Sequence, residues 1–332
     1  MEILRQEKKR LFKFLNKLKS SYELVAPVKK DIVRFEKIEN IPDIYLDKNS
    51  YFPIKEYFFK KNDVLFNFSG TKIIVPQLKS VSRVFFGLRK CDLNAIRHQD
   101  MVFMGQVQDP YYSAERKNSF LIGYHCNEAP SPYCFCNSLD LVDFFDLMFY
   151  DNGDYFLIEV GSEKGKFLVN KFKSFFSESD EKITQADKKI PGADRLEKKD
   201  ISKLYDHPDW KKGVDLCLSC AACTTICPTC YCFEINDETL TKDAKQGSRK
   251  RIWSSCQVQE FTRVAGDYTF RKDREERFKH RIYHQLEYFK QKNGINLCVG
   301  CGRCIEGCPT RIDFVQIINE MDDGNAKSKT NS

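Results

Sequence analysis

The chain contains two matching cysteine runs, CLSCAACTTICP at residues 217–228 and CVGCGRCIEGCP at residues 298–309. In each run two, two and three residues separate the four cysteines, and a proline follows the last. This spacing is typical of paired [4Fe–4S] clusters, in which the fourth cysteine of each run ligates the other cluster. We therefore expect two clusters with crosswise ligation. The first set is Cys217, Cys220, Cys223 and Cys308, and the second is Cys298, Cys301, Cys304 and Cys227.

Zinc is the main alternative to clusters. Zinc sites also use Cys-x-x-Cys pairs, but they need two pairs that close a tetrahedron. Two complete four-cysteine runs, each ending in Cys-Pro, favour clusters. Gly300 and Gly302 allow backbone N–H groups to approach the cluster sulfurs, and such hydrogen bonds raise the reduction potential. Ser219 and Ala221 hold the matching positions of the first run, which favours unequal potentials for the two clusters.

Composition and charge narrow the class of protein. Fifteen cysteines without an export signal indicate cluster or metal ligation rather than a disulfide framework. The formal charge of +7 treats every cysteine as neutral. Each cluster adds roughly −2, so two clusters leave about +3 and three leave about +1, which gives little support to nucleic-acid binding. No apolar run reaches the roughly 20 residues of a membrane span. We expect a cytoplasmic protein that binds neither nucleic acid nor membrane.

Residues 1–205 are predicted to form a mixed α/β domain. The expected elements are strands at 31–38, 64–68, 72–75, 82–87 and 119–124, a helix at 92–104, and a hairpin from 155–160 to 166–169. The strand, helix and strand within 82–124 predict a parallel pair with a right-handed crossover. A charged stretch at 177–204 is typical of an exposed connection, and we place the domain boundary near Asp206.

Residues 206–332 are predicted to form an all-α, helical ferredoxin-type domain. About 70 residues separate the two cysteine runs, and we expect helices to fill this gap. Phe278, Ile282 and Leu286 recur on one helical face, and Gly294 lies where a helix C-cap is expected. A final helix is expected around Val315.

Four cysteines of the N-terminal domain are candidates for a third [4Fe–4S] cluster. Cys91 follows the strand expected at 82–87, and Cys126 follows the strand at 119–124. If these strands are parallel neighbours, both cysteines lie at the carboxyl edge of the sheet, the usual ligand site of open α/β folds. Cys134 and Cys136 follow on the next loop. Their spacing matches no standard run, so four ordinary buried cysteines are the alternative.

Cys230, Cys232 and Cys256 receive no assignment, because three cysteines are one short of a cubane. They could line a cluster pocket, hold a labile metal, react with a partner, or pack near the clusters. No glycine-rich nucleotide-binding motif and no hydrolase motif is present. His280 and His284 share a helix face, but we expect them to be solvated rather than to bind metal.

Several segments resemble one family of redox subunits. The longest are CLSCAACTTICPTCYCF at 217–233, RKRIWSSCQVQEFTRVAGDYTFR at 249–271 and CVGCGRCIEGCPTRIDFVQIINEM at 298–321, with KCDLNAI, DPYYSAERKNSFLIG and CFCNSL nearer the N-terminus. They resemble the iron–sulfur electron-transfer subunit of anaerobic sulfite reductase and, equally, the beta subunit of sulfhydrogenase-type nickel–iron hydrogenases. The resemblance supports the eight cysteines of the two runs as ligands, and the four N-terminal cysteines as further candidates.

The resemblance implies an electron-relay subunit of an anaerobic oxidoreductase complex, with no catalytic residues of its own. Its partners would be a flavin-containing subunit, supplied by a nicotinamide cofactor or ferredoxin, and a catalytic subunit that handles sulfite or hydrogen. One alternative is a redox-sensing iron–sulfur protein that acts through a partner or nucleic acid. Another is a self-contained enzyme with an open-site cluster.

Overall fold

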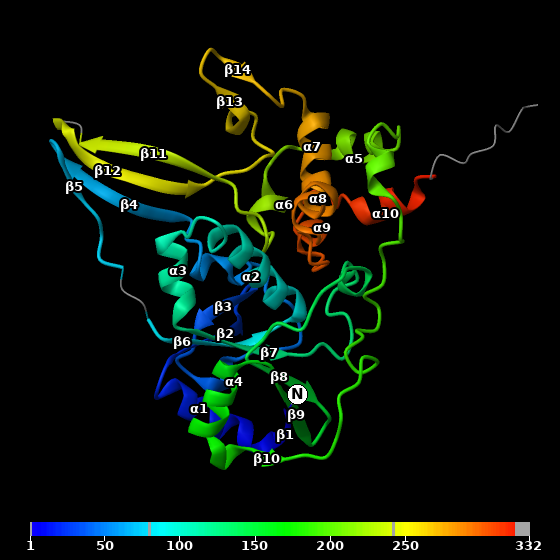
Figure 1. Ribbon diagram of the computed structural model, residues 1–332. Helices are drawn as coiled ribbons and strands as arrows, with labels where there is room; N and C mark the ends of the chain where they lie inside the picture. Colours follow the sequence, from blue (N-terminus) through cyan, green and yellow to red (C-terminus); the bar gives the residue numbers. More distant parts are fainter. Residues whose placement is uncertain (1, 79–80, 241–242, 323–332) are drawn as a thin grey trace, which may run out of the picture.

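The computed structural model describes residues 2–78, 81–240 and 243–322 (Figure 1). Its largest element is an eight-stranded sheet with the order β10-β1-β9-β8-β7-β6-β2-β3. The four strands β2, β6, β7 and β8 run parallel, and the outer strands pair antiparallel. The strands are β1 (Glu2–Glu7), β2 (Glu23–Lys29), β3 (Val33–Lys37), β6 (Arg83–Leu88), β7 (Ser119–Tyr124), β8 (Leu147–Asp151), β9 (Tyr155–Val160) and β10 (Ser177–Glu178).

The crossover from β6 to β7 is helical, as the sequence predicted. The helices of the N-terminal half are α1 (Leu11–Lys19), α2 (Lys90–Phe103), α3 (Pro110–Lys117) and α4 (Glu163–Lys171). Helices α2 and α3 connect β6 to β7, and the two strands pair in parallel with Arg83 opposite Ser119. The parallel βαβ pattern expected within 82–124 is therefore confirmed.

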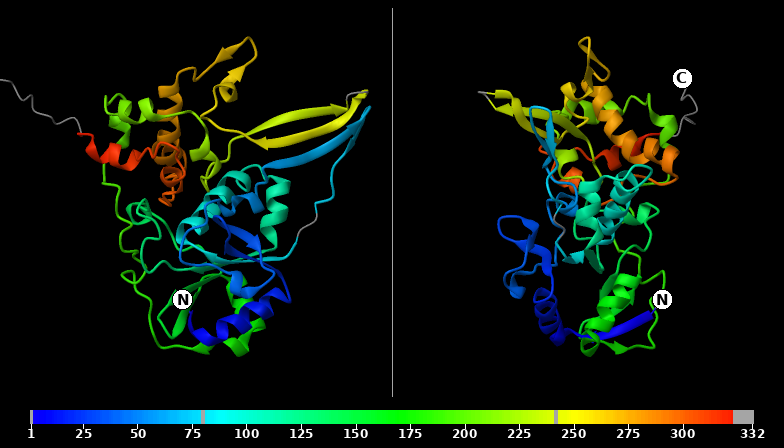
Figure 2. Two further views of the ribbon diagram at one scale, coloured as in Figure 1. Left: turned by 180° about the vertical axis from the view of Figure 1, so that it is seen from behind. Right: turned by 60° about the vertical axis from the view of Figure 1, so that its left-hand side comes forward.

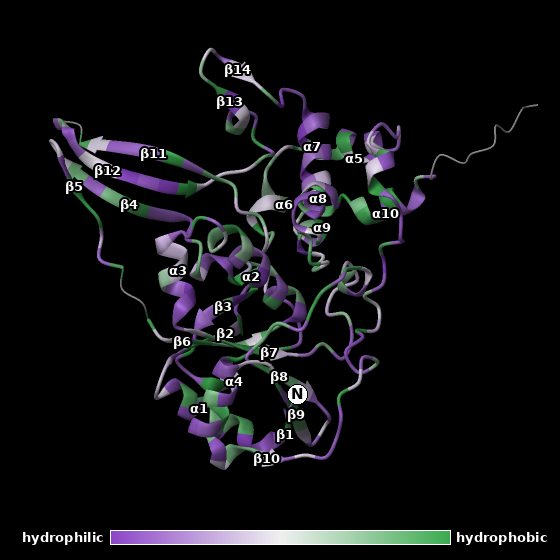
Figure 3. Ribbon diagram, viewed as in Figure 1, coloured by the Kyte–Doolittle hydropathy of each residue, from purple (hydrophilic) through white to green (hydrophobic). Residues whose placement is uncertain are grey.

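Helices cover both faces of this sheet, because successive residues of a strand point to opposite sides. Val84 and Phe86 of β6 share a core with Phe14 of α1 and with α4 on one face. Phe85, between them, shares a second core with Ile96 of α2 and with α3 on the other face. Figure 3 shows that apolar and polar residues are interspersed along the outer helices α1 and α4.

The predicted hairpin from 155–160 to 166–169 does not form. The prediction of its first strand is right, and the prediction of its second strand is wrong. Residues 155–160 form β9, but the segment that was expected to return as a strand is part of α4. Ser162 caps this helix, since its Oγ accepts a hydrogen bond from the Gly165 backbone N–H at 3.1 Å. β9 is already paired with β8 and β1 on its two sides, so no free edge is left for a returning strand.

The prediction of an all-α C-terminal half is also wrong. Between the two cysteine runs lie β11 (Phe233–Leu240) and β12 (Asp243–Trp253), followed by the short pair β13 (Arg263–Val264) and β14 (Tyr268–Thr269). β11 and β12 form a four-stranded sheet with β4 (Asn62–Ser69) and β5 (Lys72–Ile74) of the N-terminal half. Figure 2 shows this sheet as an arm that stands away from the main body.

The arm lacks the pattern by which strands are recognised in a sequence. All eight side chains of β11 are exposed, so no alternation of apolar and polar residues marks it. Backbone pairing with β12 stabilises it instead, and exposed ion pairs such as Arg249 with Asp237 at 2.7 Å and Lys250 with Glu238 cross the same two strands. The arm crosses the domain boundary that the sequence predicts near Asp206, because β4 lies before this boundary and its partner β12 lies after it. The boundary itself stays a prediction.

Short helices surround the cysteine runs in the rest of the C-terminal half. They are α5 (Trp210–Leu216), α6 (Ala222–Thr225), α7 (Arg274–Tyr283), a π-helical turn (His284–Tyr288), α8 (Phe289–Asn293), α9 (Arg303–Glu306) and α10 (Phe314–Glu320). α8 ends at Gly294 in the left-handed conformation, at φ 77°, which confirms the predicted C-cap. Within the described residues, no helix combines the length and the apolar character needed to cross a bilayer.

A buried ion pair fastens the arm to the body and provides a test of this architecture. The Arg251 side chain of β12 is 2% exposed and bonds Asp63 of β4 at 2.8 Å, and also Asp109 at the start of α3. Replacing Arg251 with Ala leaves the buried Asp63 carboxylate without its cation and removes one partner of the half-buried Asp109, so we expect a loss of about 3–5 kcal/mol in the free energy of unfolding. Denaturant unfolding under anoxic conditions measures this loss.

Arg249 is the matched control on the same strand, because its ion pair with Asp237 is exposed to solvent. Replacing Arg249 with Ala should leave the unfolding midpoint nearly unchanged. Equal midpoints for the two variants would show that Arg251 does not fasten the arm.

Candidate functional site

The two cysteine runs fold into the same local structure. The backbone N–H of Ser219 donates to the Cys217 sulfur at 3.4 Å, and the N–H of Gly300 donates to the Cys298 sulfur at 3.4 Å. Both donors have left-handed backbones, with φ 52° at Ser219 and 64° at Gly300. The hydrogen-bonding role expected for Gly300 is thus also filled by a serine in the first run.

The two runs also match at a second pair of equivalent positions. Ala221 and Gly302 are left-handed, at φ 63° and 71°, and start the short helices α6 and α9. A left-handed backbone at a residue with a Cβ costs about 1–2 kcal/mol, so the fold around Ala221 must offset this strain. The shared geometry is that of an internal repeat, and α6 and α9 pack against each other.

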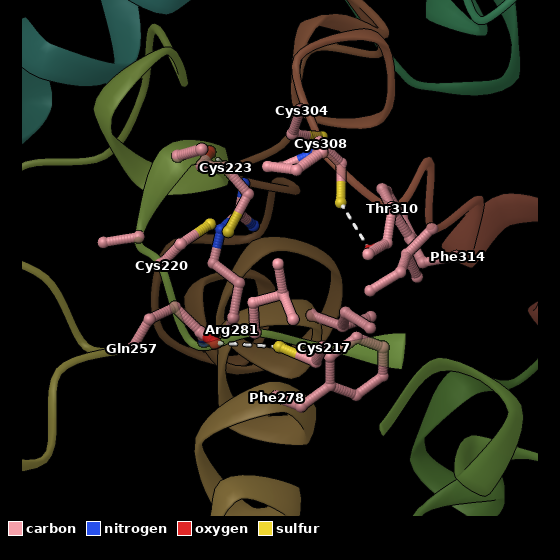
Figure 4. Close-up of a pocket in the computed structure, with 16 residues that line it drawn as sticks. Cys217, Cys220, Cys223, Gln257, Phe278, Arg281, Cys304, Cys308, Thr310 and Phe314 are labelled. Atoms are coloured by element: carbon pink, nitrogen blue, oxygen red, sulfur yellow. Dashed lines mark hydrogen bonds between the residues drawn. The ribbon is translucent and has the colours of Figure 1, made fainter. Parts of the chain in front are cut away.

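One pocket brings together the first predicted set of ligands (Figure 4). Apolar side chains form most of its wall, including Phe278, Ile312 and Phe314. Its cysteines are Cys217, Cys220, Cys223, Cys304 and Cys308. Cys308 thus reaches the first run from the second one. Burial raises the pKa of Cys223 to about 11, so this thiol needs a positive neighbour before it can act as a ligand.

A second, smaller pocket brings together the other predicted set. Its cysteines are Cys227, Cys298, Cys301 and Cys304. Cys227 belongs to the first run, so each run contributes its last cysteine to the pocket of the other. Burial raises the pKa of Cys298 to about 12. The structure does not contain the clusters themselves, and the assignment of ligands to each cluster stays a prediction.

Arg281 of α7 lies in the wall that the two pockets share. Its side chain is buried, and its Nε has no hydrogen-bond partner among the described residues. Burial lowers the pKa of Arg281, but the sulfurs of Cys230 and Cys227 outweigh this effect and raise the pKa well above its usual value. A buried cation with an unpaired N–H group, set among cysteines, fits a bound group of negative charge such as an iron–sulfur cluster.

Sequence reasoning missed Arg281, because its helix face was expected to be solvated. Gln285, one turn later, is also buried, and burial lowers the pKa of His280 and His284 to about 4. The sequence offered one signal for the burial of Arg281, which is its position. Arg281 directly precedes Ile282, and Ile282 lies on the apolar face of a helix between the two cysteine runs.

The four N-terminal cysteines converge beside the second pocket. Cys91 starts α2 after β6, and Cys126 follows β7, so both lie at the carboxyl edge of parallel neighbours. Cys126, Cys134 and Cys136 pack in one buried cluster, and Cys91 packs against Cys301. Burial raises the pKa of Cys134 and of Cys136 to about 12. Cys136 also acts on the Cys91 thiol, so the four buried thiols are neighbours, and a third cluster on them stays a prediction.

The second cysteine run docks directly on the loop that carries these cysteines. The Phe135 N–H donates to the Gly300 carbonyl at 2.8 Å. A Cβ on Gly300 would lie 2.6 Å from the Cys136 backbone, and one on Gly302 would lie 2.6 Å from the Tyr133 backbone. Glycine is required at these positions because two backbones meet there, a role that the sequence did not reveal.

Arg303 lies between the second pocket and the N-terminal cysteines. It is buried, pairs with Asp92 at 2.8 Å, and donates to the Ser50 carbonyl at 2.7 Å. Burial lowers the pKa of Arg303, but Asp92 and the sulfurs of Cys301 and Cys91 raise it well above its usual value. A buried arginine therefore lies between neighbouring groups of cysteines in both cases: Arg281 between the two pockets, and Arg303 between the second pocket and the N-terminal cysteines.

Comparisons with known proteins identify the domain that holds the two cysteine runs and the family of the chain. Residues 216–312 match the family model described as a 4Fe–4S dicluster domain, so the chain carries [4Fe–4S] clusters rather than zinc. The chain is 35% identical over 329 residues to sulfhydrogenase 2 subunit beta of Pyrococcus furiosus, covering 94% of this chain and 96% of that protein. It is 25% identical over 174 residues to F420-dependent formate dehydrogenase subunit beta of Methanocaldococcus jannaschii, covering 49% and 38%. No solved structure matches it.

Replacing Arg281 with Gln should make the clusters harder to reduce, because it removes a positive charge next to both. One charge at about 6 Å with an effective dielectric constant of about 20 corresponds to a shift on the order of 100 mV toward lower potential. Redox titration followed by EPR measures the shift. Arg281→Lys keeps the charge and is the control, so its potentials should stay close to those of the native chain. Equal shifts in both variants would contradict the electrostatic role.

Proposed function

This chain belongs to the family of the sulfhydrogenase beta subunit, and from that premise we propose that it relays single electrons inside an oxidoreductase complex. The observation that carries the proposal is the pair of cysteine-lined pockets that share Arg281 and Cys304 in one wall. Two redox centres that are separated by a single layer of side chains can exchange an electron directly. No protein group has to react in this transfer. A [4Fe–4S] cluster, when bound, supplies one-electron chemistry.

The proposed ligand sets follow from the pocket linings. Cys217, Cys220 and Cys223 with Cys308 hold one cluster, and Cys298, Cys301 and Cys304 with Cys227 hold the other. The residues around the ligands tune the site: N–H groups of Ser219 and Gly300 stabilise ligand sulfurs, and Arg281 offsets negative charge. Phe278 and Phe314 limit the access of water.

We propose a third [4Fe–4S] cluster on Cys91, Cys126, Cys134 and Cys136. Four buried thiols at the carboxyl edge of a parallel sheet support it, as does the buried cation Arg303 between them and Cys301. The order of the cysteine groups along the molecule then defines a path from the first pocket through the second to the N-terminal half.

The outer end of this path lies at the first pocket, where Cys220 is exposed and Leu218 is 63% exposed. We propose that a redox partner docks here, and that the partners are a flavin-containing subunit and a catalytic subunit in the cytoplasm. A sulfhydrogenase-type complex is favoured over a sulfite reductase, because the relative with 35% identity bears that name. No described side chain is assigned a catalytic role.

Crosswise ligation predicts a specific pattern of iron loss. Cys308→Ser and Cys217→Ser each affect the same cluster, so the double variant should lose no more than about four iron atoms, as each single variant does. The control pair, Cys308→Ser with Cys298→Ser, affects both clusters and should lose twice as much. Iron and sulfide analysis of anoxic protein, with EPR, measures the loss. Ligation within each run would reverse the two results.

The relay itself is tested in the assembled complex. We expect the native chain to co-purify with a flavin-containing subunit, and Cys308→Ser to slow electron transfer to the catalytic subunit while the complex stays intact. A chain that stays monomeric and reduces substrate unaided would contradict the proposal.

The third cluster predicts that Cys91→Ala and Cys136→Ala each lower the iron content by about four atoms per chain, because each removes one ligand of the same cubane. The signals of the other two clusters should persist, which separates loss of this site from general unfolding. Unchanged iron content in both variants would refute the third cluster.

A further inference from the structure

Cys232 and Cys256 lie together at the base of the arm, outside both cluster pockets. Phe233, the first residue of β11, pairs with Trp253, the last residue of β12. The Ser254 N–H donates to the Cys232 carbonyl at 3.0 Å and extends this ladder by one step. The end of β12 therefore brings Cys256 back to Cys232, which is 24 residues earlier in the chain.

The two thiols are in contact but differ in their access to solvent. Cys256 is 3% exposed, whereas Cys232 is half-buried and lines an open cavity with Lys55 and Trp253. Hydrogen bonds from the thiol and the backbone N–H of Cys256 outweigh burial and lower the pKa of Cys232 to about 7. An accessible sulfur in contact with a buried one is the arrangement that forms and breaks disulfides.

Two buried basic side chains, Lys55 and Arg281, lie near the pair, and burial lowers the pKa of Lys55. Lys55 is buried, donates to the Cys230 carbonyl at 2.9 Å and lies over the Trp253 ring, 4.2 Å from its centroid. Lys55 and Arg281 both act on the sulfur of Cys232 and favour its charged form. Lys55 comes from the N-terminal half, so the environment of the pair forms only in the folded chain.

The pair also adjoins the first cluster pocket. The Thr224 hydroxyl bonds the Ser255 hydroxyl at 2.8 Å, which fixes the segment before Cys256 against α6. Gln257, the next residue, lines the first pocket and lies 4.0 Å from the Cys217 sulfur through its Oε1. Ala221 lines both this pocket and the open cavity beside Cys232. The dithiol and the first cluster thus share a wall.

Two features together distinguish this pair from the proposed ligands: its thiols are in contact, and neither cysteine lines a cluster pocket, whereas the thiol of the proposed ligand Cys227 contacts Cys230 but lines the second pocket. Ligand sulfurs bind separate corners of a cubane, and neighbours such as Cys217 and Cys223 influence each other only through space. The thiols of Cys232 and Cys256 are hydrogen-bonded to each other. A disulfide requires such an approach, since its S–S bond is about 2.0 Å long.

We propose that Cys232 and Cys256 form a redox-active dithiol–disulfide pair that exchanges two electrons with the clusters; this inference rests on the proposed relay function. Reduction would break the S–S bond of the pair with two electrons, one from each of two bound clusters, and with two protons that enter from water through the cavity beside Cys232. Oxidation would form the S–S bond as both thiols lose their protons to water and pass one electron to each of two bound clusters. The pair thereby couples one-electron carriers to a two-electron reaction at sulfur.

The test counts electrons and labels thiols in the complete chain loaded with clusters. Mediated coulometric titration of the native chain should take up two more electrons than the Cys232→Ser and Cys256→Ala variants, at equal iron content. Alkylation with iodoacetamide in denaturant, which exposes the buried Cys256, followed by mass spectrometry should label Cys232 and Cys256 when the chain was reduced and neither of them when it was oxidised. Ser254→Ala, a neighbour without a thiol, is the control and should behave like the native chain.

Three other outcomes are possible, and each would overturn the inference for a different reason. If iron content falls in Cys232→Ser or Cys256→Ala, the two thiols hold a cluster or metal and do not form a disulfide. If all variants keep their iron and take up as many electrons as the native chain, the pair is redox-inactive, while the proposed relay function stands. Absence of clusters from the native chain removes the relay function together with the inference.

Discussion

Arg281 and Arg303 place positive charge between groups of buried cysteines, and the rest of the structure depends on this balance. Thiolates and clusters carry negative charge that an apolar interior does not stabilise unless opposite charge is close by. Arg281 lies in the wall between the two pockets, and Arg303 lies between the second pocket and the N-terminal cysteines. Each arginine is itself buried, so neither side of the balance is stable alone. Cluster binding and folding are therefore expected to support each other.

The close contact between the second cysteine run and residues 133–136 joins the two halves of the chain. Gly300 and Gly302 allow backbones to meet where any side chain would separate them. This approach would shorten the distance that an electron crosses between the second pocket and the proposed third cluster. In the first run Ser219 and Ala221 adopt the same left-handed backbone, and there the fold carries the strain of a Cβ atom in this conformation.

The arm built from β4, β5, β11 and β12 has a second role, since it supports the dithiol at its base. The buried Arg251 fastens β12 to Asp63 and Asp109, and thereby holds the end of β12 near α6. Cys232 and Cys256 flank the two strands and meet only because the ladder closes between them. The three cysteines that the sequence left unassigned lie close together: Cys230 contacts Gln285 and lines the open cavity with Cys232, and Cys232 in turn contacts Cys256.

The sequence by itself determined the cluster chemistry and the parallel βαβ unit, because both depend on local spacing: cysteines two, two and three residues apart, and apolar strands on either side of a helix. It also led to the family, through segments that span most of the chain. Only the tertiary structure decided the arm, the burial of Arg281 and the meeting of Cys232 with Cys256. β11 exposes every side chain and pairs through its backbone, and β12 pairs with β4 from the other half of the chain, so no local pattern marks either contact. Long-range backbone pairing and buried charge are invisible to periodicity, because they depend on which distant segments the folded chain brings together.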